Sequence, residues 1–281
     1  MSEVTSVRGP APAALAHEVV GTGPPLVLLH GVGLDRTMWR RCLPALAARH
    51  RVVCADLRGH GGSPAATPGV TLDELAADVA ALVDGLGAPA HVVGFSLGAL
   101  VAQQTGLTRP ELIASLTLVS SVAGRTTQER AAVTRRRRAA AEDFGASAGA
   151  AVDRWFSPRW LEREPELPAE VLATLLGNDP LSYLACYDVF ATADARLWPL
   201  LPRITAPTLA VTGADDPGST PDMTRRLAAR IPAARALVLP ETRHLLPLER
   251  PNELVRAILT HTEQHTGQQT GQHTGQSTGQ E

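Results

Sequence analysis

The chain has 281 residues, of which 44% are hydrophobic and 19% are charged, and its formal net charge at pH 7 is −2. This is enough for one sizeable core, with or without a large insertion. The near-neutral balance excludes a broadly basic surface, so we expect neither nucleic acid nor a membrane among its partners. No signal-peptide pattern opens the chain, and no apolar run reaches the roughly 18 residues of a membrane span, which predicts a soluble, cytoplasmic protein.

Short apolar segments bounded by turn residues alternate with longer segments rich in Ala and Leu. This alternation is typical of βαβ units and predicts an α/β fold with a mostly parallel central sheet flanked by helices. The predicted strands are 25–29, 52–55, 91–93, 115–119, 208–212 and 236–239. The predicted helices are 71–86, 97–108, 221–230 and 252–261.

The regular alternation stops near Val122 and resumes near Pro207. The segment between them has helical periodicity without a clear strand, and we predict that it forms a helical insertion over the carboxyl edge of the sheet. A run of four arginines at 135–138 lies inside this segment, with acidic residues on both sides. We interpret the run as a solvated helix face and not as a nucleic-acid site.

These observations divide the chain into a core (1–121 and 201–260), a helical cap (122–200) and a tail (261–281). The tail is a tetrapeptide repeat of the type His-Thr-Gly-Gln without an apolar residue, so we predict that it is disordered. The three cysteines are widely spaced and form no Cys-x-x-Cys pair, which indicates neither a disulfide framework nor a zinc site. We expect no metal centre.

A serine between two glycines, in the sequence GFSLG at 94–98, follows the predicted strand 91–93 and begins a predicted helix. This is the context of a nucleophile elbow, a sharp strand-to-helix turn that exposes the serine hydroxyl. The same turn aims the backbone amide of the next residue at a forming oxyanion. We therefore predict Ser96 as the nucleophile and the amide of Leu97 as one oxyanion donor.

The loop after the first predicted strand has the sequence HGVG at 30–33. A loop at this point of the chain supplies the second oxyanion donor of such a site, and the backbone amide of Val32 is our candidate. His30 is expected to shape the turn by hydrogen bonding within the loop and not to act as a base.

With these motifs the chain resembles the α/β-hydrolase superfamily over residues 16–259. Within it, the chain is most similar to the 3-oxoadipate enol-lactonases. The stretches that carry this likeness are HGVGLDRTMW at 30–39, DLRGHG at 56–61, GFSLG at 94–98 and RWFSPR at 154–159. Lactonases of this branch often have Asn-Ser-Leu-Gly where this chain has HGVG, which leaves the exact substrate open.

The resemblance also implies the order of the catalytic residues, in which the serine is followed by an acid and then by a histidine. His244 lies in the loop after the last predicted strand and is the base that fits this order. Asp215 and Asp216 follow strand 208–212, and only one of two neighbours in an extended loop can reach His244. The G-x-x-D-P pattern of this loop in the family selects Asp216. Asp56 precedes the nucleophile and is expected to tie its own loop together.

This set of residues predicts a serine hydrolase that cleaves an ester or lactone bond of a small carbon substrate through an acyl-enzyme, without a cofactor. A substrate with free carboxylates would need an arginine in the pocket, and we expect Trp155 and an arginine of the cap to contact it. Other assignments stay open: a carboxylesterase or tailoring enzyme, non-hydrolytic chemistry such as perhydrolysis, or a protein that senses a small lactone. A homo-oligomer also stays open.

Overall fold

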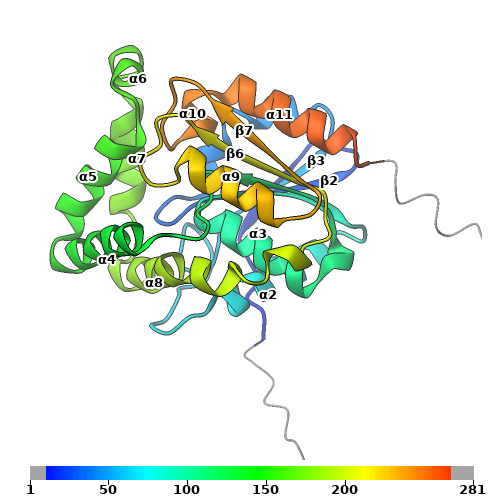
Figure 1. The fold of residues 1–281 in the computed structure, drawn as a ribbon, viewed down its shortest axis with the longest axis horizontal. Coiled ribbons are helices and arrows are strands. Elements are labelled where there is room, and N and C mark those ends of the chain that lie inside the picture. Colours follow the sequence, from blue (N-terminus) through cyan, green and yellow to red (C-terminus); the bar gives the residue numbers. More distant parts are fainter. Residues whose placement is uncertain (1–10, 267–281) are drawn as a thin grey trace, which may run out of the picture.

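The structure is a computed structural model that describes residues 11–266, and its centre is a seven-stranded sheet (Figure 1). The strand order is β1-β3-β2-β4-β5-β6-β7; β1 pairs antiparallel with β3, and every other pairing is parallel. The strands are β1 (His17–Val20), β2 (Pro25–Leu29), β3 (Arg51–Ala55), β4 (Ala90–Phe95), β5 (Ile113–Val119), β6 (Thr208–Gly213) and β7 (Ala234–Leu239). The predicted α/β fold class is confirmed.

Strand β1 was not predicted from the sequence. All four of its residues are exposed, so it has neither the continuous apolar run nor the alternation that marks a buried strand. By contrast, every residue of β2 and β4 is buried, because both of their faces are covered by helices. The sequence therefore reveals the strands that have an apolar run, including the edge strand β7, and misses the one that lacks it.

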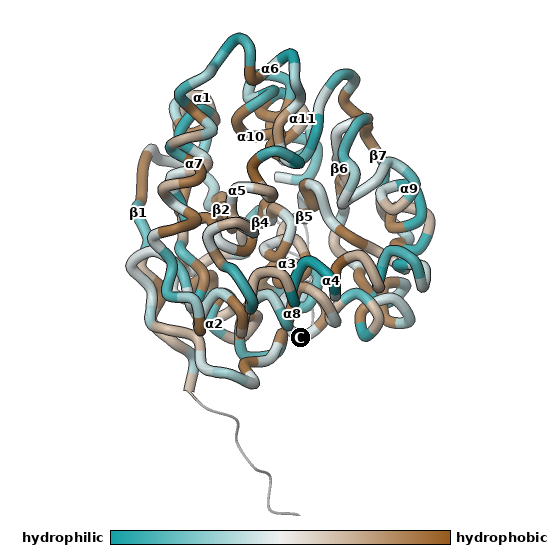
Figure 2. The backbone as a smooth tube through the Cα atoms, turned by 90° about the vertical axis from the view of Figure 1, so that its left-hand side faces the viewer, coloured by the Kyte–Doolittle hydropathy of each residue, from teal (hydrophilic) through white to brown (hydrophobic). Residues whose placement is uncertain are grey.

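The core helices lie on both faces of the sheet. Figure 2 shows α2 and α3 on one side of the strands and α1 and α11 on the other. Helix α2 begins with a capping box in which Thr71 and Glu74 satisfy each other's backbone amides. The core helices are α1 (Leu43–Ala47), α2 (Leu72–Asp84), α3 (Leu97–Thr108), α9 (Pro221–Arg230), α10 (Leu246–Glu249) and α11 (Pro251–Glu263), with 3₁₀ turns η1 (Arg36–Trp39), η2 (Pro110–Leu112) and η3 (Leu201–Arg203).

Five helices lie between β5 and β6, in the segment where a helical insertion was expected. They are α4 (Thr127–Glu142), α5 (Phe144–Trp155), α6 (Pro158–Arg163), α7 (Leu167–Leu176) and α8 (Pro180–Leu197). Figure 1 shows them gathered at one side of the sheet, and we call residues 127–197 the cap. A buried ion pair between Arg125 and Asp194, 2.8 Å long, joins the chain entering the cap to α8.

The boundary predicted between the core and the repeat tail was wrong. Helix α11 continues to Glu263, and both His261 and Thr262 are buried. His261 Nε2 lies 3.1 Å from the carbonyl oxygen of Leu116 in β5, so the first residues of the repeat complete the last helix. The predicted disorder of the remaining repeat falls largely on 267–281, outside the described residues.

The three cysteines are free and buried, in agreement with the absence of a disulfide pattern. Burial raises the pKa of Cys42 and of Cys186 to about 12, which keeps both thiols protonated and inert at neutral pH. Among the helices of residues 11–266, none is long and apolar enough to cross a membrane.

Candidate active site

Ser96 occupies the turn between β4 and α3 and has a left-handed backbone, with φ of 52°. A positive φ is strained for a residue with a side chain, and such strain gathers at functional sites. The tight packing of the turn explains the two glycines around it. A Cβ at Gly94 would lie 2.2 Å from the carbonyl oxygen of Gly98, and one at Gly98 would lie 2.6 Å from that of His30. The sequence motif therefore encodes a close approach of β4, α3 and the loop after β2.

The loop after β2 packs directly on this turn. A Cβ at Gly31 would lie 3.1 Å from that of Ser96 and closer still to the ring of Phe95. The amide of Gly98 also donates to the carbonyl oxygen of His30 at 3.1 Å, and both Val32 and Leu97 are buried. Within residues 11–266 the structure assigns no backbone acceptor to the amide of either residue. The assignment of these two amides as oxyanion donors stays a prediction.

Two buried histidines hold this loop in shape. His30 Nδ1 lies 2.7 Å from the carbonyl oxygen of Gly31, while its Nε2 accepts the amide proton of Leu57 at 2.8 Å. His60 Nε2 accepts the amide proton of Gly33 at 2.9 Å. Burial lowers the pKa of His30 to about 4 and that of His60 to about 3, so both rings are neutral at physiological pH. His30 shapes the turn, as expected.

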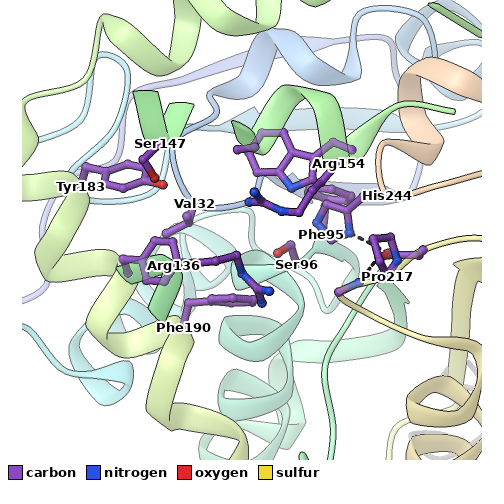
Figure 3. A pocket seen from close by; sticks show the side chains of 15 residues that line it. Val32, Phe95, Ser96, Arg136, Ser147, Arg154, Tyr183, Phe190, Pro217 and His244 are labelled. Atoms are coloured by element: carbon purple, nitrogen blue, oxygen red, sulfur yellow. Dashed lines mark hydrogen bonds and ion pairs between the residues drawn. The ribbon is translucent and has the colours of Figure 1, made fainter. Parts of the chain in front are cut away.

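His244 and Asp216 form a hydrogen bond of 2.7 Å between Nδ1 and Oδ2 (Figure 3). The other carboxylate oxygen of Asp216 accepts the amide protons of Gly218 and Ser219, at 2.8 and 2.9 Å. Both side chains of the pair are buried, whereas Asp215 is exposed. A carboxylate at Nδ1 requires a proton there, and this leaves the lone pair of the ring on Nε2.

The backbone of His244 is held from two sides. Its amide donates to the carbonyl oxygen of Trp155 at 3.0 Å, and its carbonyl oxygen accepts the hydroxyl proton of Ser120 at 3.0 Å. Ser120 follows β5 and has a positive φ of 47°, a second strained residue near Ser96. The loop that carries His244, residues 240–245, which we call the histidine loop, is therefore positioned partly by the end of β5 and partly by the cap.

These side chains meet in one pocket between the core and the cap, which encloses about 760 Å³ including its open mouth (Figure 3). Its lining residues are Val32, Phe95, Ser96, Arg136, Ser147, Ala151, Arg154, Trp155, Tyr183, Tyr187, Phe190, Asp216, Pro217, Gly218 and His244. The ring of Trp155 lies 5.8 Å from that of His244 and is tilted by 30° relative to it. Every residue that was predicted for the site, except the buried Leu97, lines this pocket.

Asp56, which was not predicted as the catalytic acid, lies in a separate network of hydrogen bonds. It pairs with the guanidinium of Arg36 and accepts the amide protons of Arg36 and Gly62, at 2.8 and 2.9 Å. It therefore ties its own loop together, as expected.

Two arginines of the cap point into the pocket in Figure 3. Within residues 11–266, neither Arg136 nor Arg154 has a carboxylate partner; Arg154 donates to the carbonyl oxygen of Ala150 at 2.7 Å. Burial, and secondarily the positive charge of Arg136, lowers the pKa of Arg154. Two such cations beside an apolar wall have the chemistry to bind an anionic group.

The interpretation of 135–138 as a solvated helix face was wrong for Arg136. Arg136 shares a helix face with the buried residues Val133 and Ala140, at spacings of three and four. That spacing was the signal in the sequence that could have revealed it. Arg137 points elsewhere and forms an ion pair of 2.7 Å with Asp188.

The comparisons with known proteins agree with this architecture. Residues 26–257 match the model of the alpha/beta hydrolase family, and the chain belongs to that family. The chain is 30% identical to 3-oxoadipate enol-lactonase 2 of Acinetobacter baylyi over 84% of its own length and 88% of the relative's. It is 29% identical to the (E)-2-((N-methylformamido)methylene)succinate hydrolase of the same organism, over 85% and 90% of the two chains.

A solved structure is similarly close. The enol-lactonase from Burkholderia xenovorans superposes with a TM-score of 0.82 at 29% identity, covering 89% of this chain and 97% of that one. The resemblance to the superfamily is thereby confirmed, and these relatives are hydrolases. Among residues 11–266, no group of three or more His, Cys, Asp or Glu side chains is arranged to hold a metal ion.

Proposed function

We propose that this protein is a serine hydrolase that cleaves the ester or lactone bond of a small substrate bearing a carboxylate. The observation that carries the proposal is the hydrogen-bonded pair of His244 and Asp216 in the wall of the pocket that also contains Ser96. The proton on Nδ1 leaves Nε2 as the basic nitrogen, in the pocket that Ser96 also lines. This is the arrangement of a Ser-His-Asp triad.

The reaction has two halves. Ser96 Oγ attacks the substrate carbonyl while His244 Nε2 takes the hydroxyl proton, and the amides of Val32 and Leu97 stabilise the oxyanion. The tetrahedral intermediate collapses, the carbon–oxygen bond breaks, and His244 returns the proton to the leaving oxygen. Water then attacks the acyl-enzyme, His244 accepts its proton and returns it to Ser96, and the carboxylic acid leaves. The residues present carry out every step, and no cofactor takes part.

The cap supports the substrate class. A guanidinium binds a carboxylate through charge-assisted hydrogen bonds, and Arg136 and Arg154 lie on the pocket wall with free donors. Trp155 and Phe190 add an apolar surface for a short carbon chain. The similarity to enol-lactonases favours a 3-oxoadipate enol-lactone-like substrate, whose enol product would tautomerise to a ketone. A small-molecule substrate and a cytoplasmic location remain our predictions. The oligomeric state stays open.

The test is hydrolysis of a panel by the wild type and by Ser96→Ala. The panel contains 3-oxoadipate enol-lactone, uncharged lactones and p-nitrophenyl esters. We expect the enol-lactone to be hydrolysed fastest and Ser96→Ala to lose on the order of 10⁶-fold in kcat, as for other serine nucleophiles. Turnover that survives in Ser96→Ala would disprove the serine mechanism. Fast hydrolysis of p-nitrophenyl esters alone would instead identify a carboxylesterase.

A further inference from the structure

Glu249 is a buried carboxylate outside the proposed triad, at the end of the short helix α10. One of its oxygens accepts the backbone amide proton of Ser157, which directly precedes helix α6 of the cap. The other accepts the amide proton of Arg243 at 2.9 Å, the residue before His244. A single side chain therefore bridges the cap and the histidine loop.

Further bonds join the same two segments. The guanidinium of Arg243 donates to the carbonyl oxygens of Asp153 and Phe156, at 3.1 Å each. The carbonyl oxygen of Trp155 accepts the amide protons of His244 and of the residue after it. Residues 153–157 of the cap and 243–249 of the core thus form one hydrogen-bonded unit that contains both the proposed base and the tryptophan of the pocket.

The chemistry at Glu249 requires both of its oxygens to be acceptors. Each one faces a backbone amide, and these two amides stabilise the ionised carboxylate against the cost of burial. Burial itself raises the pKa of Glu249. A carboxamide at this position would present one oxygen and one N–H₂ group, so one of the two amides would face a donor and lose its bond.

We propose that Glu249 is a positioning residue, which fixes His244 relative to Ser96 and Trp155 by bonding the histidine loop to the cap. The proposal rests on the proposed serine mechanism. Glu249 is not among the residues that line the pocket, so it acts through His244. A loss of its bridge shifts the imidazole, and a misplacement of about 1 Å costs on the order of 10²-fold in rate.

The experiment compares Glu249→Gln with Glu253→Gln, an isosteric change of a partly exposed glutamate four residues later. For each variant we would measure kcat and KM, the thermal midpoint, and the rate at which an uncharged fluorophosphonate labels Ser96. The labelling rate reports the serine, the histidine and the oxyanion donors without the cap arginines, because the reagent has no carboxylate for the cap to bind. For Glu249→Gln we expect losses in kcat and in labelling on the order of 10- to 100-fold, with KM much less changed.

The NMR signature of the His244 Nδ1 proton gives an independent readout. In the wild type its hydrogen bond to Asp216 should produce a strongly downfield resonance, and in Glu249→Gln that resonance should broaden or move upfield. If Glu249→Gln does not fold, Arg243→Met removes two bonds of the same unit and keeps the buried carboxylate. Arg243→Met should then show the same pattern at smaller amplitude.

The outcomes separate the two proposals. If the wild type is not labelled, the serine mechanism itself fails. If the wild type is labelled and Glu249→Gln reacts within twofold of Glu253→Gln, the mechanism stands and the positioning role is overturned. A loss in labelling that merely follows the unfolded fraction at the assay temperature also overturns it, because Glu249 would then act only on stability.

Discussion

The core and cap walls of the pocket differ in what they supply. The core wall presents Ser96, His244 and Asp216 at the carboxyl ends of strands, where the backbone is fixed by ladder hydrogen bonds and by close contacts at glycines. The cap wall presents aromatic rings and, among residues 11–266, both of the arginines that line the pocket. This division fits our proposal, in which the core carries out the chemistry and the cap selects the substrate, as when loops and insertions diversify one scaffold.

The largest expected effect tests the core wall. Asp216→Asn keeps the shape of the loop but allows the wrong tautomer of His244, and we expect kcat to fall on the order of 10⁴-fold with little change in KM. Asp215→Asn is the matched control on the adjacent, exposed residue and should keep near wild-type activity. Steady-state kinetics on the best substrate measure both. Equal losses in the two variants would contradict the assignment of the acid.

The next effect tests how the cap is attached. Arg125 is 3% exposed and Asp194 is 2% exposed, so Arg125→Met leaves a buried unpaired carboxylate. Removing one partner of a buried pair destabilises by about 3–5 kcal/mol, which urea unfolding would measure. Adding Asp194→Asn to Arg125→Met removes the orphan charge and should restore much of the loss. A double variant as unstable as the single one would show that the ion pair is not the cause.

The pH dependence of stability sharpens the same contrast, because burial in the core lowers the pKa of His30 and His60. The pKa of His60 is about 3 in the folded protein and near 6.5 in an unfolded chain, so the unfolded chain binds more protons in between. The contribution of His60 to the free energy of unfolding is therefore fully present above pH 6.5. It is lost as the pH drops toward 3, and this loss amounts to a few kcal/mol.

His60→Gln retains an acceptor for the amide of Gly33 without titrating, so its free energy of unfolding should change less between pH 7 and pH 5 than that of the wild type. His17→Gln, on the exposed edge strand, serves as the control. Parallel pH profiles for the wild type and His60→Gln would refute the contribution of His60.

The smallest expected effect tests the cap wall. Arg154→Gln removes one of the two pocket cations, and hydrogen bonds to charged groups contribute about 1.5–3 kcal/mol, so KM for a carboxylate-bearing substrate should rise about 10- to 100-fold. KM for an uncharged p-nitrophenyl ester should stay within about twofold. Arg159→Gln, on an exposed residue of the same cap, controls for net charge. Equal changes for both substrates would show that Arg154 does not select charge.

What the sequence alone determined lies mostly in the core. The order of Ser96, Asp216 and His244 followed from the resemblance to the family, whereas the GFSLG motif and the HGVG loop were readable because each depends on local backbone geometry after a buried strand. Helices α3 and α9 were predicted with their observed bounds for the same reason. The edge strand β1 was missed because its exposed residues carry no periodic pattern.

Tertiary structure alone decided the features that depend on contacts between distant segments. Only the folded chain shows that Asp216, and not its exposed neighbour, reaches His244 across 28 positions. The direction of Arg136 follows from how α4 lies on the core, and the bridge of Glu249 joins residues 92 positions apart. Periodicity can report which face of a helix is buried, but what that face meets is set by packing between elements, which no local pattern encodes.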